Sequence, residues 1–139
     1  MTASAIAALF VGALAVSLAL RVWLAYRHVG HVAARRDAVP AAFAERIGLP
    51  AHRKAADYTV ARTRLSVAET LAETLVLVAL TLGGGLAALV AWTDVLPFGG
   101  MGRDLILIVA VAVISGVVGL PFSYAQTFGI EVRFGFNRT

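Results

Sequence analysis

Three long stretches without a charged residue limit what this chain can fold into more than any other feature of its sequence. They cover residues 2–20, 74–93 and 105–130. Each is long enough to cross roughly 30 Å of hydrocarbon as a helix. The chain is 60% hydrophobic and 14% charged, and its mean hydropathy is +0.84, far outside the usage of soluble domains. The sequence therefore predicts an integral membrane protein.

The charge-free stretches are rich in Leu, Val, Ile and Ala and lack the alternating polarity of a barrel strand. Helices satisfy their backbone hydrogen bonds internally where no water is available. We predict an all-α fold, a polytopic membrane protein with three transmembrane helices and a helical cytoplasmic loop. Residues 1–139 would form a single transmembrane region. The predicted spans cover about 3–24, 67–92 and 104–128, and the loop covers about 25–66.

The distribution of basic residues predicts the orientation in the membrane. Of the 12 Lys and Arg residues, nine lie in residues 21–73, between the first two charge-free stretches, whereas Arg103 is the one basic residue from Asp94 to Asp104. The positive-inside rule places the basic loop in the cytoplasm, together with the C-terminal segment that begins at Glu131. The N-terminus and the Asp94 to Asp104 loop would then lie outside. We expect a bacterial inner membrane as the location and the lipid bilayer as a partner.

A sequence pI near 10.3 could suggest nucleic-acid binding. Topology and anionic lipid head groups already account for the position of the positive charges, and no aromatic stacking surface accompanies them. We therefore predict no nucleic-acid partner.

Proline and glycine divide the region after the first span. Pro40 and Gly48 predict a short helix between them, and a second helix is expected from about Ala51 into the second span. Its Asp57 lies close enough to Arg62 and Arg64 in sequence for weak surface pairing.

Three consecutive glycines at 83–85 interrupt the second span and weaken a helix by about 1 kcal/mol each relative to Ala. Close packing of small residues such as Gly12 and Gly119 against neighbouring helices is the first interpretation, and a hinge or cavity wall is the second. Pro121 is expected to bend the third span near its end.

A search for catalytic motifs finds none in residues 1–139. The chain has no Cys, no His-Glu-x-x-His, no Gly-x-Ser-x-Gly and no phosphate-binding glycine loop. His28 and His31 have a helical spacing, but an interfacial surface pair is favoured over a metal site. Ser115 has no His or Lys partner within the bilayer, and water at the membrane surface can solvate Glu73. We predict no catalytic, cofactor-binding or metal-binding residue.

Several short motifs together resemble one protein family. They are Val39-Pro40, Lys54-Ala-Ala-Asp-Tyr58, Leu120-Pro121-Phe122-Ser123 and the run from Glu131 through Gly135-Phe136-Asn137 to Thr139. The order and spacing resemble the N-terminal region of CAAX prenyl proteases, which are polytopic zinc metalloendopeptidases. The resemblance covers essentially the whole chain. Its most specific parts are the Lys-Ala-x-x-Tyr element and the Glu-x-x-x-Gly-Phe-Asn-x-Thr element.

In that family, a His-Glu-x-x-His helix and a downstream Glu bind zinc and position a water for peptide hydrolysis. None of these residues is present here, so the resemblance implies that zinc belongs to a C-terminal part outside this sequence and that this chain is inactive alone. It also implies that the segment after the third span leads into that part. The residues that match the family's motifs have a supporting role: Lys54, Tyr58, Glu131, Gly135, Phe136 and Asn137.

Two functions of different classes follow from these observations. In the first, the chain is the non-catalytic N-terminal transmembrane part of a CAAX-type zinc metalloendopeptidase that cleaves prenylated or membrane proteins. Its partners would then be the C-terminal protease region, or a second copy of itself, and protein substrates. In the second, it is a self-contained three-span protein with a structural or partner-binding role and no catalysis. A small enzyme acting on lipids is least favoured, since the spans offer almost no converging polar residues.

Overall fold

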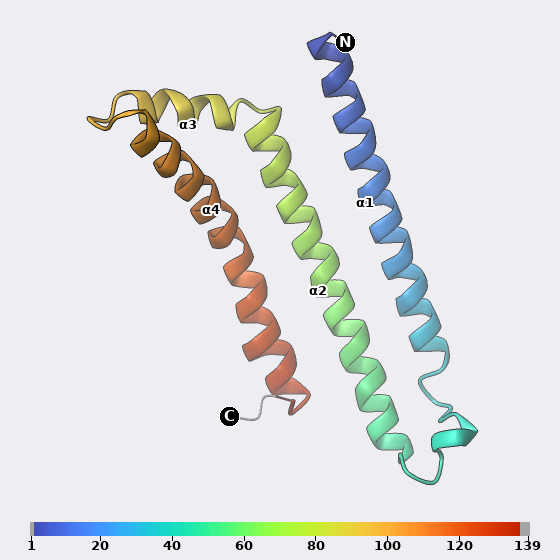
Figure 1. Cartoon of the computed structure of the whole chain (residues 1–139). Helices are drawn as coiled ribbons and strands as arrows, with labels where there is room; N and C mark the ends of the chain where they lie inside the picture. Colours follow the sequence, from blue (N-terminus) through green and yellow to red (C-terminus); the bar gives the residue numbers. More distant parts are fainter. Residues whose placement is uncertain (1, 137–139) are drawn as a thin grey trace. The chain divides into compact units, whose positions relative to one another are not determined.

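The computed structural model describes residues 2–136, and this part of the chain forms helices and no strand. The helical segments are α1 (Ala3–Ala34), η1 (Ala41–Phe43), α2 (Leu49–Thr81), α3 (Gly85–Asp94), α4 (Gly100–Tyr124) and η2 (Ala125–Glu131) (Figure 1). Two helical stretches, Ser4–Ala34 and Gly100–Glu131, are long and apolar enough to cross a membrane, and α2 with α3 gives a third if the bent pair is one span. The predicted all-α polytopic membrane fold is confirmed, while the span boundaries stay predictions.

The chain divides into two compact units. Unit 1 comprises Met1–Ala68 and Ala125–Thr139, and unit 2 comprises Glu69–Tyr124. The long helix α2 therefore contributes its first part to unit 1 and its last part to unit 2.

In unit 1, α1 and the first part of α2 are joined by a mostly irregular segment. The side chain of Thr2 caps α1 by accepting a hydrogen bond from the amide of Ala5 (3.4 Å). The predicted short helix between Pro40 and Gly48 is wrong in extent, because only the 3₁₀ turn η1 forms. Each residue of η1 is exposed, and so short a helix has no packing to offset the cost of nucleation. The long helix expected next is present as α2.

In unit 2, the glycine triplet ends α2 and starts α3. The amides of Leu82 and Gly83 both donate to the carbonyl of Val78, at 2.8 and 3.0 Å. Gly84 then adopts a left-handed conformation with φ of 77° and forms the N-cap of α3, a conformation that costs other residues roughly 1–2 kcal/mol. The two helices are bent by 56° at this break. The glycines thus redirect the chain within the predicted second span.

A short turn connects α3 to α4 and is fixed by polar contacts. The Arg103 guanidinium donates to the Asp94 carboxylate (3.3 Å) and to the carbonyl of Leu96 (3.5 Å). The buried hydroxyl of Thr93 donates to the carbonyl of Val90 (2.8 Å). These bonds satisfy polar groups at the end of α3 within the protein itself.

The helix of the third span passes through Pro121 and changes its hydrogen-bonding pattern only afterwards. Pro121 lies inside α4, and the π-helical segment η2 begins at Ala125. Proline removes a backbone donor and strains the preceding turn. The bend expected at Pro121 stays a prediction, and the π-helical segment η2, a form that is uncommon in proteins, begins one turn later.

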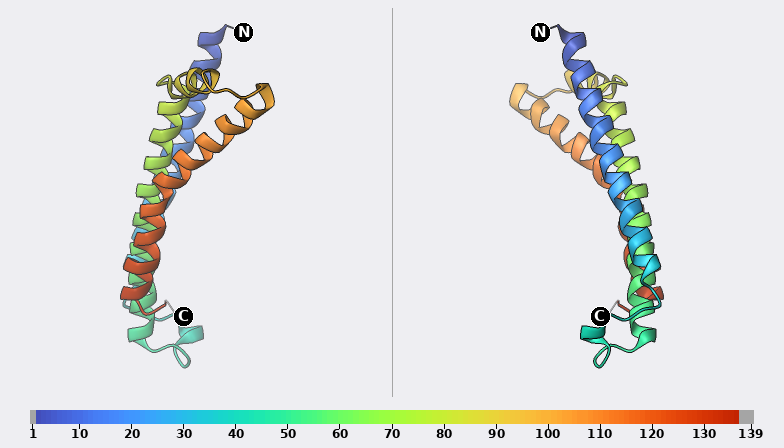
Figure 2. Two further views of the ribbon diagram at one scale, coloured as in Figure 1. Left: turned by 90° about the vertical axis from the view of Figure 1, so that its left-hand side faces the viewer. Right: turned by 90° about the vertical axis from the view of Figure 1, so that its right-hand side faces the viewer.

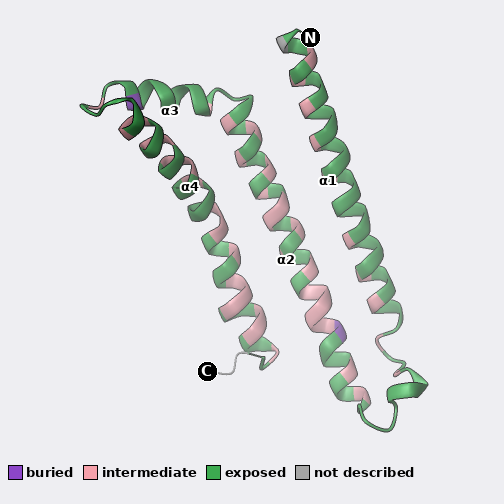
Figure 3. Ribbon diagram, viewed as in Figure 1, coloured by how far each residue is buried: buried purple, intermediate pink, exposed green. Residues whose placement is uncertain are grey.

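Few side chains are shielded from solvent within the described residues. Only Ala56 and Thr93 are buried (Figure 3). Apart from chain neighbours and the backbone of the same helix, no described atom lies within 4 Å of where a Cβ would stand at Gly12 or Gly119, so the described residues do not provide the close helix packing expected there. Many of the large apolar side chains in the described residues are exposed, as is expected of helices surrounded by lipid.

Candidate functional site

The described chain ends in a tight turn that closes η2. The amide of Phe136 donates to the carbonyl of Glu131 (2.9 Å), and the amide of Gly135 donates to the carbonyl of Val132 (3.0 Å). Gly135 itself is left-handed, with φ of 61°. This pair of bonds around a left-handed glycine is a Schellman motif, which satisfies helix-end carbonyls. The left-handed backbone conformation at position 135 therefore favours glycine there.

The turn places two phenylalanine rings against Tyr58 of α2. The Tyr58 ring lies 4.8 Å from the ring of Phe136 and 5.8 Å from that of Phe134, centroid to centroid, and meets the latter edge to face. The Lys54 ammonium lies 5.3 Å from the centre of the Phe136 ring, a cation–π geometry. We call Lys54, Tyr58, Phe134, Gly135 and Phe136 the tail cluster. Figure 2 shows the C-terminal turn near the end of the molecule where α2 begins.

Helical spacing explains why both α2 residues meet the turn. Lys54 and Tyr58 are four residues apart and so lie on one face of α2. A Cβ at Gly135 would stand 3.4 Å from the Lys54 Nζ, so the backbone of the turn approaches that side chain closely. The turn and α2 thus fit together with little free space.

The tail cluster unites the two sequence elements that resemble the prenyl proteases. Lys54 and Tyr58 come from the first element, and Gly135 and Phe136 from the second. The backbone carbonyl of Glu131 accepts the hydrogen bond from Phe136 that closes the turn. Its carboxylate accepts a hydrogen bond from the Gln126 amide (3.5 Å). Asn137 lies outside the described residues. The supporting role of these residues stays a prediction, but their meeting gives it a geometric basis.

A second contact beside the tail cluster joins the segment after α1 to α2. Arg36 forms a bidentate pair with Asp57: Nε donates to Oδ1 at 2.6 Å and a terminal nitrogen donates to Oδ2 at 2.8 Å. Asp57 was expected to pair with Arg62 or Arg64, and this is wrong. The planar guanidinium of Arg36 can donate to both carboxylate oxygens of Asp57 at once. Arg62 and Arg64, on the same helix as Asp57, are less well placed to do so.

The Arg36 guanidinium shifts the titration of its partner. Its hydrogen bonds, and to a smaller extent its charge, hold the pKa of Asp57 below the ordinary value, against a desolvation effect in the opposite direction. Arg133 and Arg53 act in the same sense through their charges. The hydrogen bond to Asp57 in turn raises the pKa of Arg36. Since Arg133 belongs to the C-terminal turn, the turn interacts electrostatically with the Asp57 carboxylate.

Two more polar contacts reinforce the same junction. Arg53 donates from Nε to the Asp37 carboxylate (2.7 Å), and the His52 ring bonds to the carbonyl of Arg35 (3.0 Å). We call Arg36, Asp37, Arg53 and Asp57 the ionic clamp. Sequence reasoning missed Phe134 and Arg36. The aromatic spacing of the C-terminal run could have indicated Phe134, but nothing local in the sequence indicates Arg36, which lies 21 residues from Asp57.

His31 and His52 take part in hydrogen bonds, and the histidines form no metal site in the described part of the chain. The Arg35 guanidinium contacts the His31 ring, and His52 bonds to the Arg35 carbonyl as above. Residues 2–136 contain no group of three or more His, Cys, Asp or Glu side chains placed to hold a metal ion. Together, the tail cluster and the ionic clamp are suited to holding polypeptide segments in place, and they offer no activated nucleophile or base.

The fold defines a helical integral membrane protein, and in unit 1 its C-terminal turn packs against the first part of α2. A family model described as "CAAX prenyl protease N-terminal, five membrane helices" matches residues 28–139. The chain therefore belongs to the family of CAAX prenyl protease N-terminal membrane domains. No curated protein and no solved structure matches it.

Proposed function

We propose that this chain is the non-catalytic N-terminal membrane part of a CAAX-type zinc metalloendopeptidase that cleaves prenylated or membrane proteins. The observation that carries the proposal is the tail cluster, in which the two elements typical of the family meet. Because the turn is held against α2, a protease region attached after it would begin at a fixed place beside this helix. The chain would thus act by positioning the protease region at the membrane and not by chemistry of its own.

Zinc does not fit the residues that the structure describes. The described histidines bond to or contact Arg35, or lie apart from carboxylates, and no His-Glu-x-x-His motif occurs in residues 1–139. We therefore assign the metal to a protease region outside these residues and derive no catalytic step here. The partners in this proposal are the bilayer, the protease region or a second copy of this chain, and protein substrates.

The distribution of charge supports an orientation with the ionic clamp in the cytoplasm. Eight of the 12 Lys and Arg residues lie in residues 25–66, the segment that contains it, and the positive-inside rule retains such segments in the cytoplasm. The N-terminus and the turn between α3 and α4 would lie outside. A bacterial inner membrane is the proposed location.

The direct test reads the coding sequence beyond the codon of Thr139. An in-frame His-Glu-x-x-His motif is expected, and replacing its Glu by Gln should abolish cleavage of a farnesylated CAAX peptide by the purified product. A stop codon with no such motif in a neighbouring frame would instead favour the three-span structural protein without catalysis. In that case the tail cluster would simply close the fold.

A further inference from the structure

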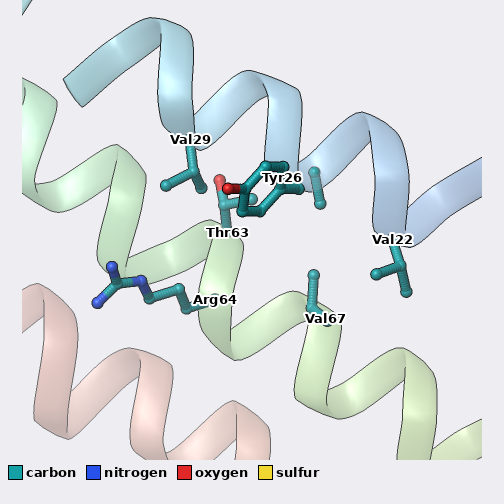
Figure 4. A pocket seen from close by; sticks show the side chains of 7 residues that line it. Val22, Tyr26, Val29, Thr63, Arg64 and Val67 are labelled. Carbon is teal, nitrogen blue, oxygen red and sulfur yellow. The ribbon is translucent and has the colours of Figure 1, made fainter. Parts of the chain in front are cut away.

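A groove in unit 1 separates α1 from the first part of α2 (Figure 4). Its volume is about 320 Å³, near the lower limit for sites that bind small molecules. Residues from both helices line it: Val22, Ala25, Tyr26, Val29, Thr63, Arg64 and Val67.

Most of the groove is lined by apolar side chains, and its one charged side chain, that of Arg64, lies towards one end. Val22 of α1 and Val67 of α2 lie at the end that leads towards the predicted spans, whereas Arg64 and Val29 lie towards the ionic clamp (Figure 4). The Arg64 side chain extends away from Val67 and so away from the predicted second span (Figure 4). Long basic side chains at the ends of spans commonly direct their charge in this way.

Arg64 has no anionic partner in the described part of the chain. The ion pairs there occupy Arg36, Arg53 and Arg103, and none reaches Arg64. Arg64 is exposed, so its guanidinium is open to an anion from outside the described residues, such as a lipid head group.

Neighbouring side chains on α1 are those of a membrane–water interface. The Arg27 guanidinium lies 5.0 Å from the centre of the Trp23 ring, and Tyr26 is largely exposed at 79%. Trp and Tyr concentrate at the level of lipid head groups. The residues near the polar end of the groove are thus of the types that favour the level of phospholipid head groups.

We propose that this groove binds an anionic phospholipid. Its phosphate pairs with the Arg64 guanidinium, and one acyl chain lies against the apolar wall formed by Val22, Ala25 and Val67. The excess of basic residues in the segment between the first two spans favours an anionic over a zwitterionic head group. A lipid at this position would fill the space between α1 and α2 and hold the two helices at a defined separation.

The test measures lipid selectivity by native mass spectrometry. The full chain is purified from vesicles containing phosphatidylglycerol and phosphatidylcholine, and the ratio of the two bound lipids is measured. Arg64→Gln should lower the preference for phosphatidylglycerol about five-fold, since one basic side chain near an anionic surface contributes about 1 kcal/mol. Arg62→Gln is the matched control, because Arg62 is exposed on the same helix but does not line the groove, and it should change the ratio less than two-fold.

Two further variants separate the site from an effect on folding. Arg64→Lys keeps the charge and should retain most of the preference. Ala25→Leu keeps every charge but fills the apolar wall, and it should reduce the number of bound lipids. Equal losses in the Arg62 and Arg64 variants would show only diffuse attraction. An unchanged ratio in Arg64→Gln, or equal binding of the two lipids by the wild type, would also overturn the proposal.

Discussion

Replacing Tyr58 with alanine should release the C-terminal turn from α2. The two ring contacts of Tyr58, at 4.8 and 5.8 Å between centroids, both lie in the range where aromatic pairs contribute about 0.5–1.5 kcal/mol each. Losing both removes about 1–3 kcal/mol. Because about 1.4 kcal/mol is a factor of ten, the population of released turn should rise about 5- to 150-fold.

Trypsin cleavage after Arg133 provides the assay, because this bond becomes a good substrate when the turn leaves α2. The cleavage rate follows the open population when opening is fast relative to cleavage. Cleavage after Arg46 in the same sample is the internal reference, since Arg46 is exposed and lies outside the tail cluster. The ratio of the two rates, followed by mass spectrometry in lipid nanodiscs, should increase in Tyr58→Ala by the factor given above.

Tyr58→Phe is the matched variant. It keeps both ring contacts and removes only the hydroxyl, so the cleavage ratio should stay within about two-fold of the wild type, a change of less than 0.5 kcal/mol. If Tyr58→Ala were cleaved no faster than Tyr58→Phe, the aromatic contacts would not hold the turn, and the reasoning from ring geometry would be refuted.

Three other perturbations test separate parts of the structure. The pKa of Asp57 lies below its ordinary value of 3.8. Its pairing with Arg36 therefore stabilises the fold above that pH, and this stabilisation is lost as the pH falls below it. On acidification below about pH 4, the melting temperature of Asp57→Asn should fall less than that of the wild type. Gly84→Ala should destabilise unit 2 by about 1 kcal/mol because φ is positive there, whereas Gly12→Ala, in open space on α1, should not lower the melting temperature. The chain has no Cys, so a single cysteine introduced at Ala44 or at Gly99 can report on which side of the membrane that position lies. An impermeant maleimide added from outside should label Gly99→Cys and not Ala44→Cys. Labelling of Ala44→Cys from outside would contradict the proposed orientation.

The helices could be predicted from sequence because their determinants are local. Stretches without charge and the glycines at 83–85 set where the apolar helices run and where one of them breaks. The segment between Pro40 and Gly48 has strong local signals as well, yet it forms only η1. Local signals choose a conformation there but cannot supply the packing that stabilises a helix of two turns.

The contacts of the site could be predicted only in part because they join residues that are distant in sequence. The resemblance to a family identified Lys54, Tyr58, Gly135 and Phe136 without indicating that they touch. The Arg36–Asp57 pair carries no sequence signal, since nearer basic residues were equally plausible partners for the carboxylate. Geometry decides between them: only Arg36 presents its guanidinium fork to both carboxylate oxygens.

The tail cluster also constrains how the chain passes through a membrane. Tyr58 contacts Phe134 and Phe136 directly, so the two segments lie on the same side, and the chain between them must cross an even number of times. Gly100–Glu131 is long and apolar enough for one crossing. A re-entrant path for α2 and α3 would leave the count odd and would separate Tyr58 from the turn it contacts. If Gly100–Glu131 crosses the membrane, the bent pair therefore has to cross it as well, which requires the glycine break to lie within a span and favours the three-span topology.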